Sequence, residues 1–182
     1  MNNTYRYTLI STVVFSSVIV DQISKYVARA TLASRPPIIF LDDLFRFHYA
    51  ENTGAFLSLG DTLSDSLRFW LLTGVNSLVL LAVAVFLVAK PKMETMLAVA
   101  LSLILSGGIG NLIDRIVNDG RVIDFMNLGL PWVSIYGWEP RTGIFNVADV
   151  AIVAGLVLVF VLEFTRAYRQ QQEFTRAEDP ET

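Results

Sequence analysis

A single apolar run, from Leu67 to Ala89, limits what this chain can fold into more than any other feature. It contains 23 residues, and its only charge is Arg68 near its beginning. As an α-helix rising 1.5 Å per residue, the run would be about 34 Å long, enough to cross a hydrocarbon core of ~30 Å. Because lipid offers the backbone no hydrogen-bond partners, the run predicts a membrane-spanning helix.

Three further apolar runs accompany it, at residues 7–30, 93–113 and 144–164. Hydrophobic residues make up 53% of the chain and charged residues 17%, against about 25% charged in typical soluble domains. We therefore predict an all-α integral membrane protein with four transmembrane helices. A cleaved signal peptide is the poorer interpretation of the first run, because Asp21, Lys25 and Arg29 follow its apolar part.

The connection at residues 31–66 has a different character. Ile38–Leu41 and Phe45–Tyr49 are rich in β-branched and aromatic residues and flank two aspartates, which predicts short strands around a turn. Asn52-Thr53-Gly54 is a further turn signal. Backbone of this kind is not tolerated facing lipid. We expect a small β-rich cradle at the membrane surface, between the first and second helices.

The placement of lysine and arginine indicates the orientation. With four spans, one membrane side receives the start of the chain, the loop after the second span and the end of the fourth. These places hold Arg6, Lys90, Lys92, Arg166 and Arg169. We predict cytoplasmic termini and extracytoplasmic connections at 31–66 and 114–143. Residues 1–169 would form one membrane-embedded domain, and 170–182 a polar cytoplasmic tail within a solvated or disordered segment that begins at Thr165.

The amino-acid composition excludes several kinds of functional site. The chain has no cysteine and one histidine, His48. Disulfides, thiolate nucleophiles and cysteine-based metal sites are therefore excluded, and a histidine-based triad or zinc site is disfavoured. The formal net charge of −3 offers no basic field for nucleic acid. We predict no metal, no cofactor and no nucleic-acid partner.

Polar residues accompany the first and third spans. Asp21 and Lys25 lie four positions apart and so share a helix face. They are either a mutually neutralising pair that lets the span insert, or part of a site. The third span carries a small residue at every fourth position, which favours close helix packing: Ala98, Ser102, Ser106 and Gly110. It ends in Asn111, Asp114 and Arg115.

Two aspartates stand beside the last spans, Asp124 in Val122-Ile123-Asp124-Phe125 and Asp149 just after Asn146. A carboxylate at membrane depth costs roughly 2.5–3.5 kcal/mol on insertion scales, so each is a functional-site hypothesis. The structural alternative for the second is a helix start, with Asn146 as N-cap and Asp149 at the positive end of the helix dipole.

Two close carboxylates can hydrolyse a peptide without Cys, His or metal. Because like charges cannot both ionise readily at short range, one carboxyl keeps its proton and acts as general acid, while the other acts as general base. Proton-coupled transporters also carry aspartates at membrane depth. A small proton-coupled transporter, suggested by Asp21, Lys25 and Asp114, and a noncatalytic membrane scaffold therefore remain alternatives.

Five motifs, in order along nearly the whole chain, resemble those of lipoprotein signal peptidase (signal peptidase II), a bacterial membrane aspartyl protease family. They are Asp21-Gln22-Ile23-Ser24-Lys25, Asn52-Thr53-Gly54-Ala55-Phe56, Gly107-Gly108-Ile109-Gly110-Asn111-Leu112-Ile113-Asp114-Arg115, Val122-Ile123-Asp124-Phe125 and Phe145-Asn146-Val147-Ala148-Asp149.

The resemblance implies that Asp124 and Asp149 form a catalytic dyad. It implies cleavage of lipid-modified prolipoproteins before a diacylglyceryl-modified cysteine, at the extracytoplasmic face of the bacterial inner membrane. It also implies residues that shape or support the pocket: Asp21, Asn52, Gly54, Asn111, Arg115 and Asn146. Lys25 and Asp114 belong to the same motifs and have site-supporting or structural roles. We expect a monomer whose partners are its substrates and membrane lipids.

Two features depart from the family pattern. The 24 residues between Asp124 and Asp149 form a longer connection than is usual, with an insertion around Leu130–Thr142. Val150 occupies a position where a small or hydroxyl residue is common. The first feature concerns the conformation of the loop over the site, and the second concerns hydrogen bonding beside Asp149.

Overall fold

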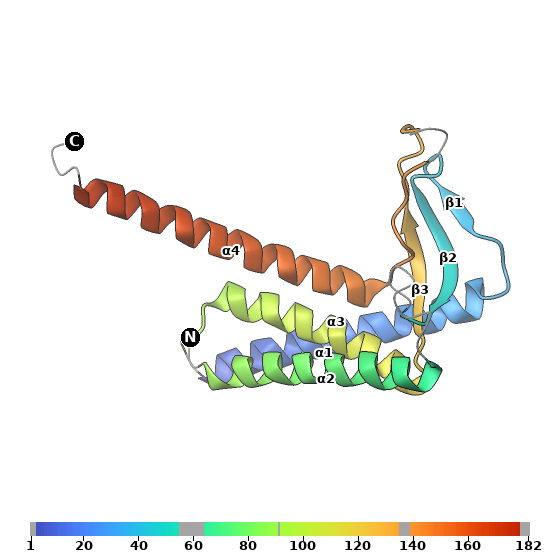
Figure 1. Ribbon diagram of the computed structural model, residues 1–182, viewed down its shortest axis with the longest axis horizontal. Coiled ribbons are helices and arrows are strands. Elements are labelled where there is room, and N and C mark those ends of the chain that lie inside the picture. The colour runs from blue at the N-terminus through green and yellow to red at the C-terminus, as the bar shows by residue number, and fades with distance from the viewer. Residues whose placement is uncertain (1–2, 55–63, 91, 135–138, 179–182) are drawn as a thin grey trace.

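The structure is a computed structural model that describes residues 3–54, 64–90, 92–134 and 139–178. Within these ranges the chain forms, in order, α1 (Asn3–Leu32), β1 (Ile38–Phe40), β2 (Phe45–Asn52), α2 (Asp65–Ala89), α3 (Thr95–Val117), β3 (Val122–Leu128) and α4 (Val147–Glu178). Helix α4 begins near the strands and tilts away from the other three helices toward its C-terminal end, and the strands stand at one end of the helices (Figure 1).

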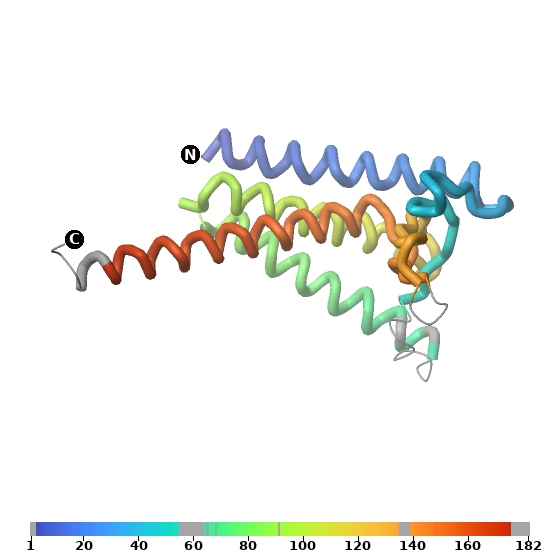
Figure 2. Tube along the Cα trace, turned by 90° about the horizontal axis from the view of Figure 1, so that it is seen from above, coloured from blue at the N-terminus to red at the C-terminus, as the bar shows by residue number. Residues whose placement is uncertain are grey.

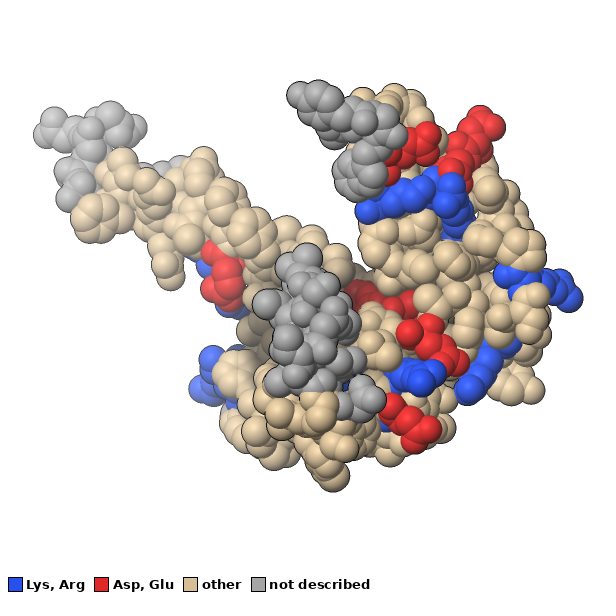
Figure 3. Space-filling model, turned by 45° about the vertical axis from the view of Figure 1, so that its right-hand side comes forward, with Lys and Arg blue, Asp and Glu red and all other residues tan. Residues whose placement is uncertain are grey.

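All four helices are long and apolar enough to cross a membrane. Large apolar side chains point outward from them, including Tyr26, Trp70, Leu78 and Phe160. Contiguous apolar surface of this kind is costly in water and favourable in lipid. Most charged side chains in view lie over the strands and the neighbouring helix ends (Figure 3). The predicted fold class, a four-helix membrane protein with a small sheet, is confirmed.

Helix α3 packs against each of the other three helices (Figure 2). Its predicted small-residue face is buried along its whole length, from Ala98 to Gly110. A Cβ atom on Gly107 would lie 2.3 Å from the carbonyl oxygen of Ala148 on α4, and one on Gly108 would lie 2.2 Å from Leu80 on α2. These contacts explain the two glycines, because the α4 backbone lies where a side chain on Gly107 would be, and the Leu80 side chain lies where one on Gly108 would be.

The strands form one antiparallel sheet in the order β1-β2-β3. The expected pair of strands around the two aspartates is confirmed, with Ile38 opposite Phe47 and Phe40 opposite Phe45. The third strand was not predicted, and it comes from the connection between α3 and α4. The cradle is therefore built from both long connections. Because Ala50 of β2 lies opposite Asp124, this pairing carries Asp124 to the neighbourhood of Asn52.

The helices differ from the predicted spans by a few residues at most ends, and two differences at α4 concern the site and the tail. The fourth span was expected from residue 144, but α4 begins at Val147, because Phe145 still pairs with Met126 beside the sheet. The polar segment from Thr165, expected to be solvated or disordered, continues α4 as a helix to Glu178. Described side chains there, such as Tyr168, are exposed, so this part of the segment is a helix whose side chains lie on the surface of the chain.

The insertion around Leu130–Thr142 is anchored at its base. Leu130 N–H donates to the carbonyl of Pro140, and Thr142 N–H to that of Leu128, so the chain returns antiparallel to the end of β3. Residues 135–138 lie outside the described residues. Arg141 donates to Asn127 Oδ1 at 3.0 Å and forms an ion pair with Asp43 in the β1–β2 turn. The insertion is thereby tied to the first two strands.

The opposite end of the molecule holds both termini and the α2–α3 connection (Figure 1). The buried Arg6 donates to the carbonyls of Val88 and Lys90, which are free acceptors at the end of α2. Arg166 pairs with Glu94 at 2.5 Å across the start of α3. The basic residues that were predicted to share one side therefore do share one end, away from the sheet.

Candidate functional site

The site begins where α4 begins. Asn146 immediately precedes the first helical residue, and its Oδ1 accepts a hydrogen bond from the N–H of Asp149 at 2.9 Å. In return, Asp149 Oδ2 accepts from the N–H of Asn146 at 3.1 Å. This is a reciprocal capping arrangement that satisfies two otherwise free helix N–H groups. The structural prediction for Asn146 and Asp149 is thus confirmed.

Asp124 lies on β3 and is 3% exposed. Its Oδ2 accepts from the Asn52 amide nitrogen at 3.0 Å, and its Oδ1 accepts from the Asn146 amide nitrogen at 2.7 Å. The pKa of Asp124 is raised to about 6, mainly by burial and in smaller part by the nearby charge of Asp149, while the two amide hydrogen bonds oppose the rise. Asp124 is therefore a carboxyl group that retains its proton more readily than an exposed aspartate.

One asparagine joins the two carboxyl groups. The Asn146 side chain donates to Asp124 with its nitrogen and accepts from the backbone of Asp149 with its oxygen. Asn111, on α3, donates to Asp149 Oδ1 at 2.8 Å and accepts from the Asn146 nitrogen at 3.0 Å. The fold therefore brings the two predicted aspartates and three of the predicted asparagines, Asn52 included, into one network.

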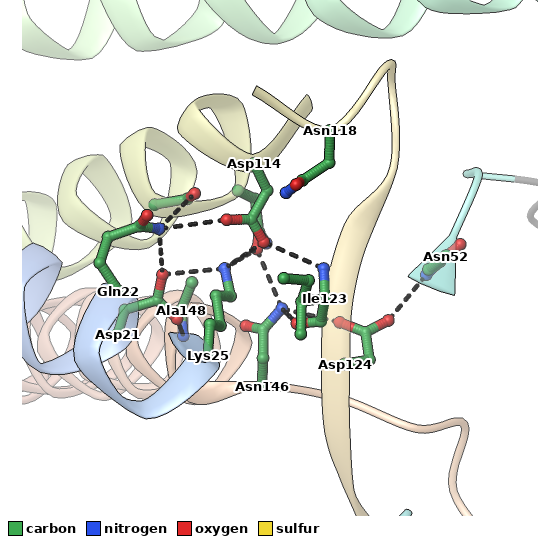
Figure 4. A network of polar contacts seen from close by, with 12 residues as sticks. Asp21, Gln22, Lys25, Asn52, Asp114, Asn118, Ile123, Asp124, Asn146 and Ala148 are labelled. Carbon is green, nitrogen blue, oxygen red and sulfur yellow. Dashed lines mark hydrogen bonds and ion pairs between the residues drawn. The ribbon is translucent and has the colours of Figure 1, made fainter. Parts of the chain in front are cut away.

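The other predicted polar residues form a buried cluster beside this network (Figure 4). Lys25 Nζ lies 2.8 Å from Asp21 Oδ2 and 3.0 Å from Asp114 Oδ2. All three side chains are nearly inaccessible. The proposed pairing of Asp21 with Lys25 is confirmed, and Asp114 is its third member. Together they link α1 to α3.

Sequence reasoning missed Gln22. Its amide nitrogen lies 3.2 Å from Asp21 Oδ2, from Asp114 Oδ1 and from the carbonyl of Gly110. Gln22 lies inside the first motif, but no contact and no role were assigned to it from the sequence. Its polarity within an apolar span was the available signal.

Gly54 and Arg115 lie at the edge of the site. Gly54 has a φ of +79°, which an L-residue rarely adopts, and its N–H donates to Asn52 Oδ1 at 2.8 Å. That bond leaves the Asn52 nitrogen directed at Asp124. A Cβ on Gly54 would lie 2.4 Å from Leu72 Cδ1. Arg115 donates to the carbonyl of Gly120 at 3.0 Å and so holds the turn before β3.

Two pockets open beside the network. One, of about 330 Å³, lies between α2, α3 and α4 and is lined by three polar side chains, Asn76, Asn111 and Arg115, among apolar residues. The other, of about 410 Å³, is lined by Phe145, Asp149 and Val150. Val150, at the departure from the family pattern, is thus part of a pocket wall. In the described part of the chain, no three His, Cys, Asp or Glu side chains are grouped to hold a metal ion.

Comparisons with known proteins agree on one family. The model of the family described as signal peptidase (SPase) II matches residues 13–165. A lipoprotein signal peptidase of Pseudomonas aeruginosa is 38% identical over 144 residues, covering 78% of this chain and 79% of the relative. One of Borreliella burgdorferi is 33% identical over 162 residues, covering 87% and 91%.

Solved structures show the same fold. One bacterial membrane enzyme superposes with a TM-score of 0.67 at 25% identity, covering 84% of this chain and 90% of the other. A second gives a TM-score of 0.64 at 26% identity, covering 87% and 88%. With four membrane-spanning helices and a family match over most of its length, the chain is an integral membrane protein that belongs to the signal peptidase II family, as its motifs indicated.

Proposed function

We propose that this chain is an aspartyl endopeptidase that removes the signal peptide from bacterial prolipoproteins, cleaving before the diacylglyceryl-modified cysteine. One observation carries the proposal. Asp124 and Asp149 come from separate segments, a strand and a helix start, and a single asparagine side chain, that of Asn146, contacts both. The relatives named as lipoprotein signal peptidases supply the substrate class.

The two carboxyl groups have different surroundings, which supports different roles. Asp124 is buried, and its pKa is raised to about 6. Asp149 is partly exposed at a helix start and accepts from the Asn146 N–H and the Asn111 amide. Positive helix ends and charge-directed hydrogen bonds favour a carboxylate. In our proposal Asp149 is the ionised general base, and Asp124 is the protonated general acid.

The reaction then runs as an acid–base hydrolysis. Asp149 takes a proton from water while the water oxygen attacks the scissile carbonyl carbon, and Asp124 donates its proton to the carbonyl oxygen. As the tetrahedral intermediate collapses, the C–N bond breaks and the leaving amine takes the proton that Asp149 holds. Asp124 recovers its proton from the hydroxyl of the intermediate. The pair ends in its starting protonation state.

The pockets suggest how the substrate is held. Both pockets lie between or along membrane-spanning helices, and their walls are mainly apolar. In our proposal, acyl chains and the apolar signal peptide lie against these walls, and the scissile bond lies beside Asp124 and Asp149. Positioning of this kind accounts for a large share of catalysis, because it replaces a bimolecular encounter with a bound geometry.

The orientation and the oligomeric state are also proposed. The end with Arg6, Lys90 and Arg166 holds the short basic α2–α3 loop, so we assign that end and both termini to the cytoplasm, and the sheet to the extracytoplasmic face. The long connections at the sheet end also contain arginines, among them Arg46, Arg121 and Arg141. The small-residue face of α3 is buried within the chain. It is thus fully used by intramolecular packing, which supports a monomer.

The test uses purified protein in detergent or lipid with a diacylglyceryl-modified prolipoprotein. Asp124→Asn and Asp149→Asn each preserve the shape of the side chain but remove its acid–base function, and each should reduce cleavage to background. Asp119→Asn, an exposed aspartate on the loop before β3, is the matched control and should cleave normally. Near-normal cleavage by either dyad variant would refute the proposal. Proton-driven flux without cleavage would favour the transporter alternative.

A further inference from the structure

The buried cluster of Asp21, Lys25 and Asp114 contacts the backbone at two related places. Asp21 Oδ1 accepts from the N–H of Ala148 at 2.9 Å, and Asp114 Oδ2 accepts from the N–H of Ile123 at 3.0 Å. Each of these N–H groups belongs to the residue immediately before one of the two site aspartates. The two carboxylates therefore hold the two segments that carry the site.

Lys25 connects these two carboxylates. Its ammonium contacts Asp21 at 2.8 Å and Asp114 at 3.0 Å, and it is 2% exposed. Two carboxylates share one ammonium, so the cluster carries an uncompensated negative charge. The N–H groups of Ala148 and Ile123 and the amide of Gln22 supply the remaining donors. A buried arrangement that is satisfied in this way is geometrically restrictive, because each group has few alternative partners.

Lys25 makes a third donor contact, with Asn111, and this contact connects the buried cluster to the candidate site. Lys25 Nζ donates to Asn111 Oδ1 at 3.0 Å. An ammonium has donors only, so the Asn111 oxygen must face it, and the Asn111 amide nitrogen is thereby directed the other way. That nitrogen donates to Asp149 Oδ1 at 2.8 Å. Reversing the amide would set its NH₂ group against the ammonium and its oxygen against the Asp149 carboxylate.

We propose that Lys25 is a positioning residue for the reaction. It fixes the orientation of the Asn111 amide so that Asn111 donates to Asp149. This inference rests on the proposed peptidase function. It differs from charge neutralisation for membrane insertion, which predicts effects of Lys25 on folding but none that depend on Asn111.

The experiment is a double-mutant cycle on the full chain, with Lys25→Met, Asn111→Ala and the combined variant. Thermal unfolding, kcat and KM are measured with the diacylglyceryl-modified prolipoprotein. Misplacement of a reacting group by about 1 Å can cost ~10²-fold in rate. We expect Lys25→Met to lower kcat by about 10- to 100-fold with KM changed less than about threefold. In the Asn111→Ala background, the further loss should shrink to less than about threefold.

Arg29→Met is the matched control. Arg29 lies one turn further along α1, and its side chain is 53% exposed and bonds to Asn118 rather than Asn111. It should leave kcat and KM near the original values. If Lys25→Met fails to fold, every variant of the cycle also carries Asp114→Asn. Removing Lys25 together with the Asp114 carboxylate keeps the formal charge of the cluster at −1, as in the unsubstituted protein.

The outcomes separate the two claims. Losses in kcat that multiply in the combined variant, or an unchanged kcat in folded Lys25→Met, overturn the positioning role while the peptidase activity stands. Absence of cleavage by the unsubstituted protein, or full activity of the Asp124 and Asp149 variants, instead overturns the proposed function. A loss that disappears once Asn111 is removed supports the inference.

Discussion

Asn146 and Asp149 cap each other at the start of α4, with N–H to Oδ2 at 3.1 Å in one direction and N–H to Oδ1 at 2.9 Å in the other. The same asparagine donates to Asp124 at 2.7 Å. The helix start and the candidate site are therefore built from the same atoms. An N-cap is a local structural device, but here it also fixes where the second carboxylate lies relative to the first.

The two roles of Asn146 can be separated by substitution. Asn146→Ser keeps a side-chain oxygen that can accept from Asp149 N–H but loses the nitrogen that donates to Asp124. Because Asp124 is the neutral acid in our proposal, this hydrogen bond is worth about 0.5–1.5 kcal/mol, and kcat for prolipoprotein cleavage should fall by about 2- to 10-fold. Asn146→Ala removes both and should also cost about 1 kcal/mol of stability.

A matched control is Asn127→Ala. Asn127 is also a buried asparagine, on the same strand as Asp124, but it donates to the carbonyl of Thr142 and accepts from Arg141. Asn127→Ala should lower thermal stability and leave kcat for prolipoprotein cleavage near that of the unsubstituted protein. Full kcat in Asn146→Ser would show that the nitrogen contact with Asp124 does not matter to the reaction.

The raised pKa of Asp124 makes stability depend on pH. In the unfolded chain this carboxyl has a pKa near 3.8, and in the folded protein burial raises it to about 6. The folded state therefore holds the proton more tightly, so the stabilising contribution is full below pH ~4 and is lost as pH rises through ~6. Relative to Asp124→Asn, the unsubstituted protein should lose thermal stability between pH 4 and 7.

The pKa of Glu51 is shifted in the opposite direction, so its contribution to stability has the opposite pH dependence. A hydrogen bond from Arg121 at 2.9 Å, assisted by Tyr49, lowers the pKa of Glu51 below its ordinary 4.5. Its contribution to stability is present above pH ~4.5 and lost as pH falls through the lowered pKa. Thermal unfolding of Glu51→Gln should therefore converge with the unsubstituted protein at acid pH. The same trend with pH in both variants would contradict the assignment for Asp124.

The contact between α3 and α4 is testable at Gly107. A Cβ there would lie 2.3 Å from the carbonyl oxygen of Ala148, and backbone cannot move aside cheaply. Gly107→Ala should shift α4, lower thermal stability and reduce cleavage, because Ala148 adjoins Asp149. Gly74→Ala on α2 is the control, since no atom lies within 4 Å of its added Cβ. It should be neutral or slightly stabilising. Equal effects of the two substitutions would refute the packing argument.

Local sequence rules determined the membrane fold. Length and apolarity predicted the four spans, because a helix must bury or satisfy every backbone group in lipid. β-Branched and aromatic residues around an aspartate turn predicted β1 and the first part of β2. The spacing of Asp21 and Lys25 predicted their contact, since residues four apart share a helix face. The order of the motifs indicated the family.

Tertiary structure alone decided how those residues meet. Strand β3 forms because the connection after α3 pairs with β2, a partner more than 70 residues earlier, and this sets Asp124 beside Asn52. The third contact of Lys25 is with Asn111, a residue 86 positions later in the sequence, and it joins α1 to α3. Hydrophobic periodicity records which face of an element is apolar, but it carries no information on which distant polar group will meet another. The candidate residues could thus be read from the sequence, while their network needed the packed helices and the sheet.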